Sequence, residues 1–124
     1  MTYPFSFGFV VTDGGSRPIT GVDLDKTVDA LMEAMLELET DVTYDSSVGA
    51  ALSSGEVDVD LEVSAQDEGS AAVLARDFVM ESIRAIGGTP IGIFTFPKET
   101  AISSASQLTP RQEWHERKAE LASA

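Results

Sequence analysis

The clearest pattern in the chain is the strict alternation of acidic and apolar residues over residues 56–63. Successive side chains of a β-strand point to opposite faces, so this alternation predicts a strand with two different faces. The acidic face would comprise Glu56, Asp58, Asp60 and Glu62, and the apolar face Val57, Val59, Leu61 and Val63. We expect the apolar face to pack on a core and the acidic face to meet water, a cation or a basic partner.

Three further segments have strand patterns of different strength. Residues 3–13 place phenylalanine and valine on one face, and residues 91–96, which lie between two prolines, form an apolar run with aromatic and β-branched side chains. Residues 42–44 predict only a short, weak strand. The small and polar residues 46–55 that follow are expected to form a loop.

Apolar residues recur at helical spacing in two segments. The first predicts a helix that is capped by Asp23 or Asp25, and the second predicts a helix over residues 67–86 that Gly87 and Gly88 terminate. The first stripe contains Leu24, Val28, Leu31, Met32, Met35 and Leu36, and the second contains Ala71, Leu74, Ala75, Phe78, Val79, Ile83 and Ile86.

The end of the chain has the pattern of a separate polar helix. Thr109, Pro110 and Gln112 match an N-cap, a proline at the first helical position and a capping-box glutamine. We therefore divide the chain into a domain over residues 1–98, a Ser/Ala-rich linker over 99–108 and a C-terminal helix over 109–124. Only Trp114 and Leu121 share an apolar stripe on this helix, so it is expected to lie over the domain, pair with a second subunit or be partly mobile.

The order strand, helix, strand, strand, helix, strand predicts an α+β fold. It matches the ferredoxin-like βαββαβ arrangement, an antiparallel four-stranded sheet with two helices on one face, here followed by the tail helix. The acidic strand would then be an inner strand, with its carboxylates in the middle of the open face. That topology serves too many activities to indicate a function by itself.

Charge is distributed unevenly along the chain. The net charge is -13, and residues 23–68 contain fourteen acidic residues against one lysine, so this segment accounts for the whole excess. Nucleic acid is not an expected partner, because phosphate binding requires a basic surface. A basic protein or a cation would be steered toward this region, although an acidic excess also serves solubility.

The composition restricts the cellular setting and the chemistry. The absence of cysteine excludes disulfides, thiolate metal sites and a cysteine nucleophile. No segment approaches the roughly 20 apolar residues of a membrane helix. The first residues lack the basic flank and the length of a signal peptide, so we expect a cytoplasmic protein without a membrane partner.

No catalytic constellation is evident. Carboxylates two apart on a strand lie about 6.6 Å apart, near the spacing used in glycosidases, but no cleft for a sugar is indicated. Asp58 and Asp60 are weak candidates for Ca²⁺ or Mg²⁺, because the glycine and ligand order of a calcium loop are absent. His115, the single histidine, has no evident acid-base partner. We therefore expect neither an enzyme nor a bound cofactor.

Three aromatic residues are candidates for partner binding. Phe94 and Phe96 would face outward if the isoleucines of the same strand face the helices, and aromatic residues on an open sheet face often mark a partner surface. Trp114 is expected to be an anchor in a groove, either on its own domain or on a partner.

These features together predict a non-catalytic interaction or assembly domain that acts through its acidic open face and its tail helix. The simplest partner is a second copy in a homodimer or larger homo-oligomer, joined through a sheet edge or through the tail helix. On that helix Arg111, Arg117 and Lys118 could reach the neighbour's acidic face. One alternative is an acidic neutraliser of a basic protein, as an immunity protein or antitoxin would be. Another is a small-ligand-binding domain with a pocket between the sheet and residues 46–55.

Overall fold

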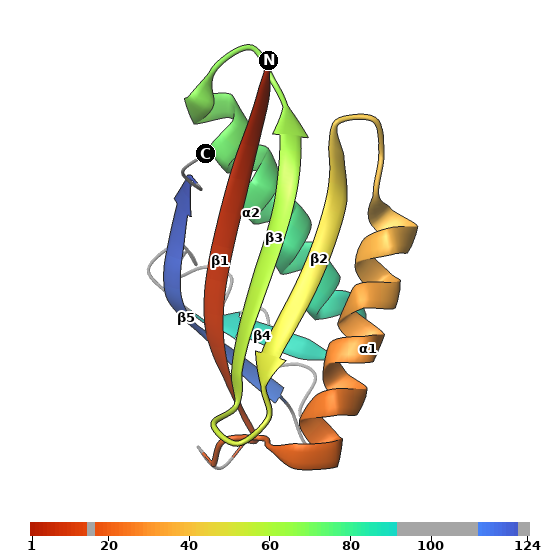
Figure 1. The fold of residues 1–124 in the computed structure, drawn as a ribbon, viewed down its shortest axis with the longest axis vertical. Coiled ribbons are helices and arrows are strands. Elements are labelled where there is room, and N and C mark those ends of the chain that lie inside the picture. Colours follow the sequence, from red (N-terminus) through yellow and green to blue (C-terminus); the bar gives the residue numbers. More distant parts are fainter. Residues whose placement is uncertain (15–16, 92–111, 122–124) are drawn as a thin grey trace.

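The computed structural model describes residues 1–14, 17–91 and 112–121, with the side chains of the last segment described as far as Arg117. A five-stranded sheet and two helices make up this part of the chain (Figure 1). Their order is β1 (Thr2–Thr12), α1 (Gly21–Leu38), β2 (Thr43–Ala51), β3 (Glu56–Ser64), α2 (Glu68–Ala85), β4 (Gly88–Ile91) and β5 (Gln112–Leu121).

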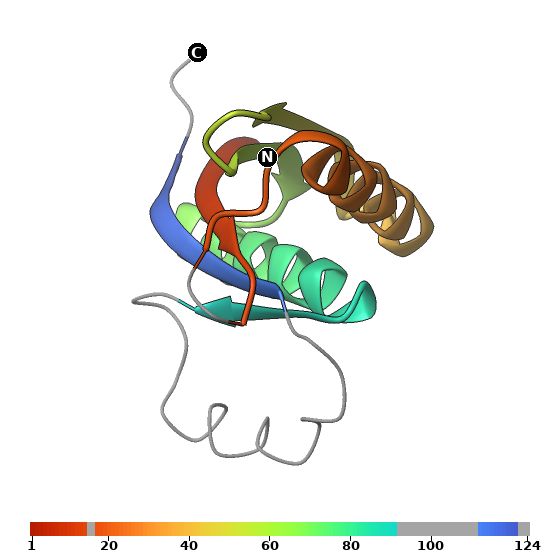
Figure 2. The ribbon, with the colours of Figure 1, turned by 90° about the horizontal axis from the view of Figure 1, so that it is seen from below.

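The sheet has the strand order β2-β3-β1-β5-β4. Neighbouring strands are antiparallel except for β4 and β5, which are parallel, so the sheet is mixed. The α+β class is confirmed, whereas the expectation of four antiparallel strands is wrong. Figure 2 shows α2 in the concave side of the curved sheet, which leaves the opposite face of β1, β2 and β3 open.

The alternation over residues 56–63 forms the expected inner strand, β3. It pairs with β1 over Glu56 to Ser64 and with β2 on its other side. Val57, Val59 and Val63 are fully buried and join the same core as the phenylalanines of β1. Burial of an aliphatic side chain contributes about 1.5–3 kcal/mol, so the apolar face fixes which way β3 is turned.

Both helices bury most of the apolar stripe that their periodicity predicts, but Leu36 of α1 and Leu74 of α2 are exposed. In α2, Asp67 is the N-cap and accepts a hydrogen bond from the Ser70 N–H at 2.7 Å, which holds the pKa of this carboxyl below its ordinary value. In α1 the expected acidic cap is wrong, because Thr20 occupies that position and its side chain makes no cap hydrogen bond. Within the described residues, no helix combines the length and apolar content needed to cross a membrane.

Strand β2 is longer than the sequence indicates. Most of residues 46–55 belong to β2, which pairs with β3 as far as Ala51, and the rest form the turn that joins the two strands. The register shifts between Tyr44 and Ser47, and Asp45 has a φ of 55° there. Small side chains gave no strand signal, so the expected loop is wrong over residues 46–51.

The C-terminal helix is the largest error of the sequence interpretation. Residues 112–121 form the strand β5, which lies between β1 and β4. A helix would have placed only two apolar side chains on one stripe, whereas the strand satisfies backbone groups on two neighbours and buries Trp114 completely. Tertiary pairing therefore overrides a strong local helix start. Thr109 and Pro110 lie outside the described residues.

Trp114 holds β5 against the core. Its ring meets that of Phe9 edge to face, with centroids 5.7 Å apart and an interplanar angle of 76°. On the other side it lies against Gly88, where an added Cβ would come within 2.7 Å of the indole Nε1 and within 2.8 Å of a methyl carbon of Ile83. Gln112 adds a hydrogen bond of 2.9 Å from Nε2 to the hydroxyl oxygen of Thr27 on α1.

Strand β4 begins earlier than expected, directly after the helix. Gly87 ends α2 in the left-handed conformation, with a φ of 84°, and donates its N–H to the Arg84 carbonyl at 3.0 Å. Pro90 is tolerated because β4 is an edge strand and one side of its backbone needs no ladder hydrogen bond. Ile91 belongs to β4, and the rest of the strand expected over residues 91–96 lies outside the described residues.

The contact between Gly88 and Trp114 gives a test of this packing. We expect Gly88→Ala to lower the free energy of unfolding by about 1–3 kcal/mol, because the new methyl group would overlap the indole and Ile83. In a Trp114→Phe background the additional cost of Gly88→Ala should be smaller, because two of the overlapping atoms belong to the indole.

Gly49→Ala is the matched control, because a Cβ at Gly49 would have no atom within 4 Å. Its effect should stay below about 1 kcal/mol in urea unfolding. Equal costs for Gly88→Ala in both backgrounds would contradict the placement of Trp114 against Gly88.

Candidate functional site: the acidic open face

The acidic row, Glu56, Asp58, Asp60 and Glu62, lies along the open face of β3. Asp58 and Asp60 are exposed, and Glu56 and Glu62 are half-buried. Because the alternate residues of the strand are locked in the core, the backbone that carries these carboxylates is a rigid inner strand rather than a loop. The row is therefore held at fixed spacing toward solvent.

Small residues flank the exposed centre of the row on both neighbouring strands. Asp58 lies between Gly8 of β1 and Gly49 of β2 in the register of the sheet, and Asp60 lies between Ser6 and Ser47. These neighbours provide almost no side-chain cover. Asp58 and Asp60 are themselves exposed, so another molecule can approach these two carboxylates.

One end of the row is partly neutralised by the same chain. The Arg117 Nη1 lies 3.2 Å from the Glu56 Oε2, with 53% and 45% of these side chains exposed. The register of β5 on β1 shifts between Gly8 and Phe9, which gives Arg117 no direct partner in the β1 register. An ion pair this exposed contributes at most about 1 kcal/mol.

This contact revises the interpretation of the basic tail residues. Arg117 was expected on a helix that reaches a neighbour's acidic face, but it meets the acidic row of its own chain. Lys118 pairs with Gly8 through its place in β5, and Arg111 lies outside the described residues.

The other end of the row is closed by hydroxyl groups. Tyr44 lies opposite Glu62 in the register, and its hydroxyl is 3.1 Å from that of Thr2 and 3.3 Å from that of Ser64. Among the side chains that the structure describes, hydroxyl groups therefore lie at one end of the row and a guanidinium at the other. The centre of the row, Asp58 and Asp60, is therefore the part best placed to attract a cation or a basic side chain.

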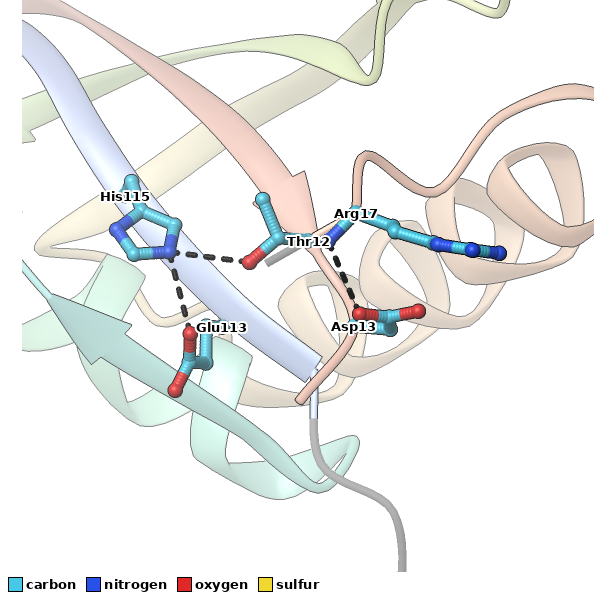
Figure 3. A network of polar contacts seen from close by, with 5 residues as sticks. All are labelled: Thr12, Asp13, Arg17, Glu113 and His115. Carbon is cyan, nitrogen blue, oxygen red and sulfur yellow. Dashed lines mark hydrogen bonds and ion pairs between the residues drawn. The ribbon is translucent and has the colours of Figure 1, made fainter. Parts of the chain in front are cut away.

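His115 has partners that the sequence did not indicate. Its Nε2 is 3.0 Å from the hydroxyl of Thr12 and 3.3 Å from Oε1 of Glu113, while Asp13 and Arg17 close the adjacent turn (Figure 3). A hydrolytic triad needs the hydroxyl on one ring nitrogen and the carboxylate on the other. Here both contact the same nitrogen, so the cluster is not arranged as a triad.

The remaining sequence candidates do not extend the acidic surface. Trp114 is fully buried in its own domain, one of the two placements expected for it, and has no exposed surface for a partner. Phe94 and Phe96 lie outside the described residues. Among the described residues, no group of at least three histidine, cysteine or acidic side chains is arranged to hold a metal. Asp58 and Asp60 therefore belong to no such group.

Glu116 is an unusual carboxyl that the sequence interpretation missed. It lies opposite the buried Phe9 in the register, and burial raises its pKa from 4.5 to about 7, although the positive charge of Arg76 acts in the opposite direction. A residue expected on a polar helix gave no signal of burial. Only the assignment of a strand would have indicated its burial, because Glu116 and Trp114 are two residues apart and lie on the same face of β5.

Comparison with known proteins gives no relative for this chain: no family model, curated protein or solved structure matches it. The function of this chain must therefore be inferred from the acidic open face itself.

Glu116 makes stability depend on pH. Its folded-state pKa is raised, so the folded chain holds more protons than the unfolded chain between about pH 4.5 and 7, and stability falls as pH rises through that window. We expect Glu116→Gln to unfold at a higher temperature than the parent at pH 8 and at nearly the same temperature at pH 4.

The control is Glu81→Gln, which removes one exposed carboxylate from α2. Thermal unfolding followed by circular dichroism from pH 4 to 8 gives the comparison. A constant difference between Glu116→Gln and the parent at every pH would contradict the burial of the Glu116 carboxyl.

Proposed function

We propose that this protein is a non-catalytic interaction domain that binds a basic partner protein through the acidic row. The observation that carries the proposal is the exposure of Asp58 and Asp60 on a rigid inner strand between small neighbours. Fixed carboxylates hold a partner in one register and increase the rate of encounter with a positively charged surface.

The contact between Arg117 and Glu56 supports a basic partner. It places a guanidinium on this same row, 3.2 Å from a carboxylate. A partner's arginine or lysine at Asp58 or Asp60 would repeat a contact of the same kind. Bidentate carboxylate recognition favours arginine.

The two partners expected from the sequence differ in how they fit this face. Two copies stacked through their open faces would oppose two acidic rows, and like charges across an interface are unfavourable. The tail helix that was to join two copies is instead the inner strand β5. A basic protein therefore fits the geometry better than a second copy, and a neutraliser of a basic protein is one form of this function.

We also propose that the fold is a ferredoxin-like arrangement with one inserted strand. Without β5 the sheet order is β2-β3-β1-β4, and β4 runs antiparallel to β1 because it is parallel to β5. This is the strand order of the split β-α-β fold. In this interpretation β5 widens the sheet without changing the inner position of β3.

A titration with tetra-arginine amide tests the proposed function. At an ionic strength of about 0.1 M, where the Debye length is about 10 Å, we expect the largest amide shifts of the ¹⁵N-labelled chain at Asp58, Asp60 and their register neighbours Gly8 and Gly49. Asp58→Asn with Asp60→Asn should raise the dissociation constant about tenfold, because two exposed ion pairs are lost.

The matched control is Asp77→Asn with Glu81→Gln, which removes the same charge from exposed positions of α2. It should change the dissociation constant less than about twofold, since screening limits charges that are more than a Debye length away. Equal weakening by both double variants would show that net charge alone attracts the peptide, and the proposed function would be wrong.

A further inference from the structure

Strand β2 presents one edge of the sheet that no other strand covers. It pairs with β3 on one side only, and Ser47, Gly49, Ala50 and Ala51 are exposed. An edge strand has a row of backbone N–H and C=O groups that can pair with another chain. In the described part of the chain, backbone hydrogen bonds of residues 47–50 are recorded only within the β2–β3 ladder.

The usable edge is short and has definite limits. At one end the register shift between Tyr44 and Ser47 interrupts regular pairing. At the other end Ala51 accepts hydrogen bonds from the N–H groups of Ser54 and Gly55 in the turn, at 3.1 and 3.2 Å. A β-bulge such as the register shift between Tyr44 and Ser47 protects an edge strand from indiscriminate pairing. An added strand would therefore pair with residues 47–51.

The surroundings of this edge determine which strand it accepts. Ser47 has a small side chain and Gly49 has none. On β2, large side chains therefore do not separate the edge from Asp60 and Asp58. Adjacent strands lie about 4.8 Å apart, which puts an added strand roughly 10 Å from β3. An extended lysine or arginine side chain bridges that distance to an aspartate. Helix α1, beside β2 in Figure 1, also exposes acidic residues, Asp29 and Glu33 among them.

We propose that the β2 edge accepts an extended basic segment of the partner as an added strand, with alternate lysine or arginine side chains over Gly49 and Ser47 toward Asp58 and Asp60. This inference rests on the proposed function and specifies the partner's chemistry and conformation. Main-chain hydrogen bonds would provide affinity, and the alternate basic side chains would provide specificity.

The same charges select against a second copy at this edge. Two β2 strands pairing edge to edge would bring two acidic rows onto one continuous sheet face. Acidic or neutral strands would gain nothing from Asp58 and Asp60, so the edge discriminates by charge. The occupant that satisfies both the open backbone and the acidic row is an extended basic segment.

The experiment compares two synthetic peptides of equal charge on the full chain. One is a fluorescent decapeptide of alternating threonine and lysine, and the other spaces the same lysines with prolines, which cannot form a backbone ladder. We expect the alternating peptide to bind about tenfold more tightly in fluorescence anisotropy. We also expect slower amide hydrogen exchange at residues 47–51 when it is bound.

Two matched variants test the path to the acidic row. Gly49→Lys adds a basic side chain on the open face, where there is room for it, and should weaken the alternating peptide about tenfold by occupying the row. Gly69→Lys, at the start of α2, makes the same change in charge and should have little effect.

Three other results would overturn the inference, each for a different reason. Equal affinity of both peptides with unchanged exchange at residues 47–51 would remove the added strand and leave the proposed function standing. Absence of binding by either peptide at low salt would remove the proposed function as well. Slow exchange at residues 47–51 without peptide, with a mass that rises with concentration, would show that a second copy occupies the edge.

Discussion

Burial of the apolar side of β3 is the constraint on which the rest of the structure depends. Val57, Val59 and Val63 are fully buried beneath the helices, so the intervening carboxylates must point the other way. A slip of one residue would place four carboxylates in the core, at a cost far above the stability of a small domain. The acidic row is thus a consequence of core packing, and its position is as fixed as the core.

The second determinant of the structure is the place of β5. A strand with several charged residues becomes an inner strand because one indole packs between Phe9 and Gly88 and because both of its neighbours need hydrogen-bonding partners. The insertion brings Arg117 to the end of the acidic row and Glu116 to the buried side. A single strand therefore sets both the local charge of the open face and the pH response of the fold.

Elements whose own residues decide their environment could be predicted from the sequence. The alternation over residues 56–63 identified β3, the order of the elements predicted its inner position, and helical periodicity that ends at Gly87 identified α2. The failures have a common cause. Residues 112–121 follow the helix-start signal of Thr109 and Pro110, and residues 46–51 are too small to give a strand pattern. Pairing with distant strands decides both segments. The contact between Arg117 and Glu56 could not be foreseen, because it depends on the misassigned strand.

We propose that the open face presents a focused negative potential at Asp58 and Asp60, which Arg117 reduces near Glu56. Comparison of the NMR line broadening caused by a cationic and by an anionic nitroxide of similar size measures this potential residue by residue. We expect the ratio of cationic to anionic broadening to be highest at Asp58 and Asp60, lower at Glu56, and lower again on α2, where acidic and basic residues nearly balance. An equal ratio on α2 and along the whole of β3 would contradict a focused site and leave only a diffuse acidic surface.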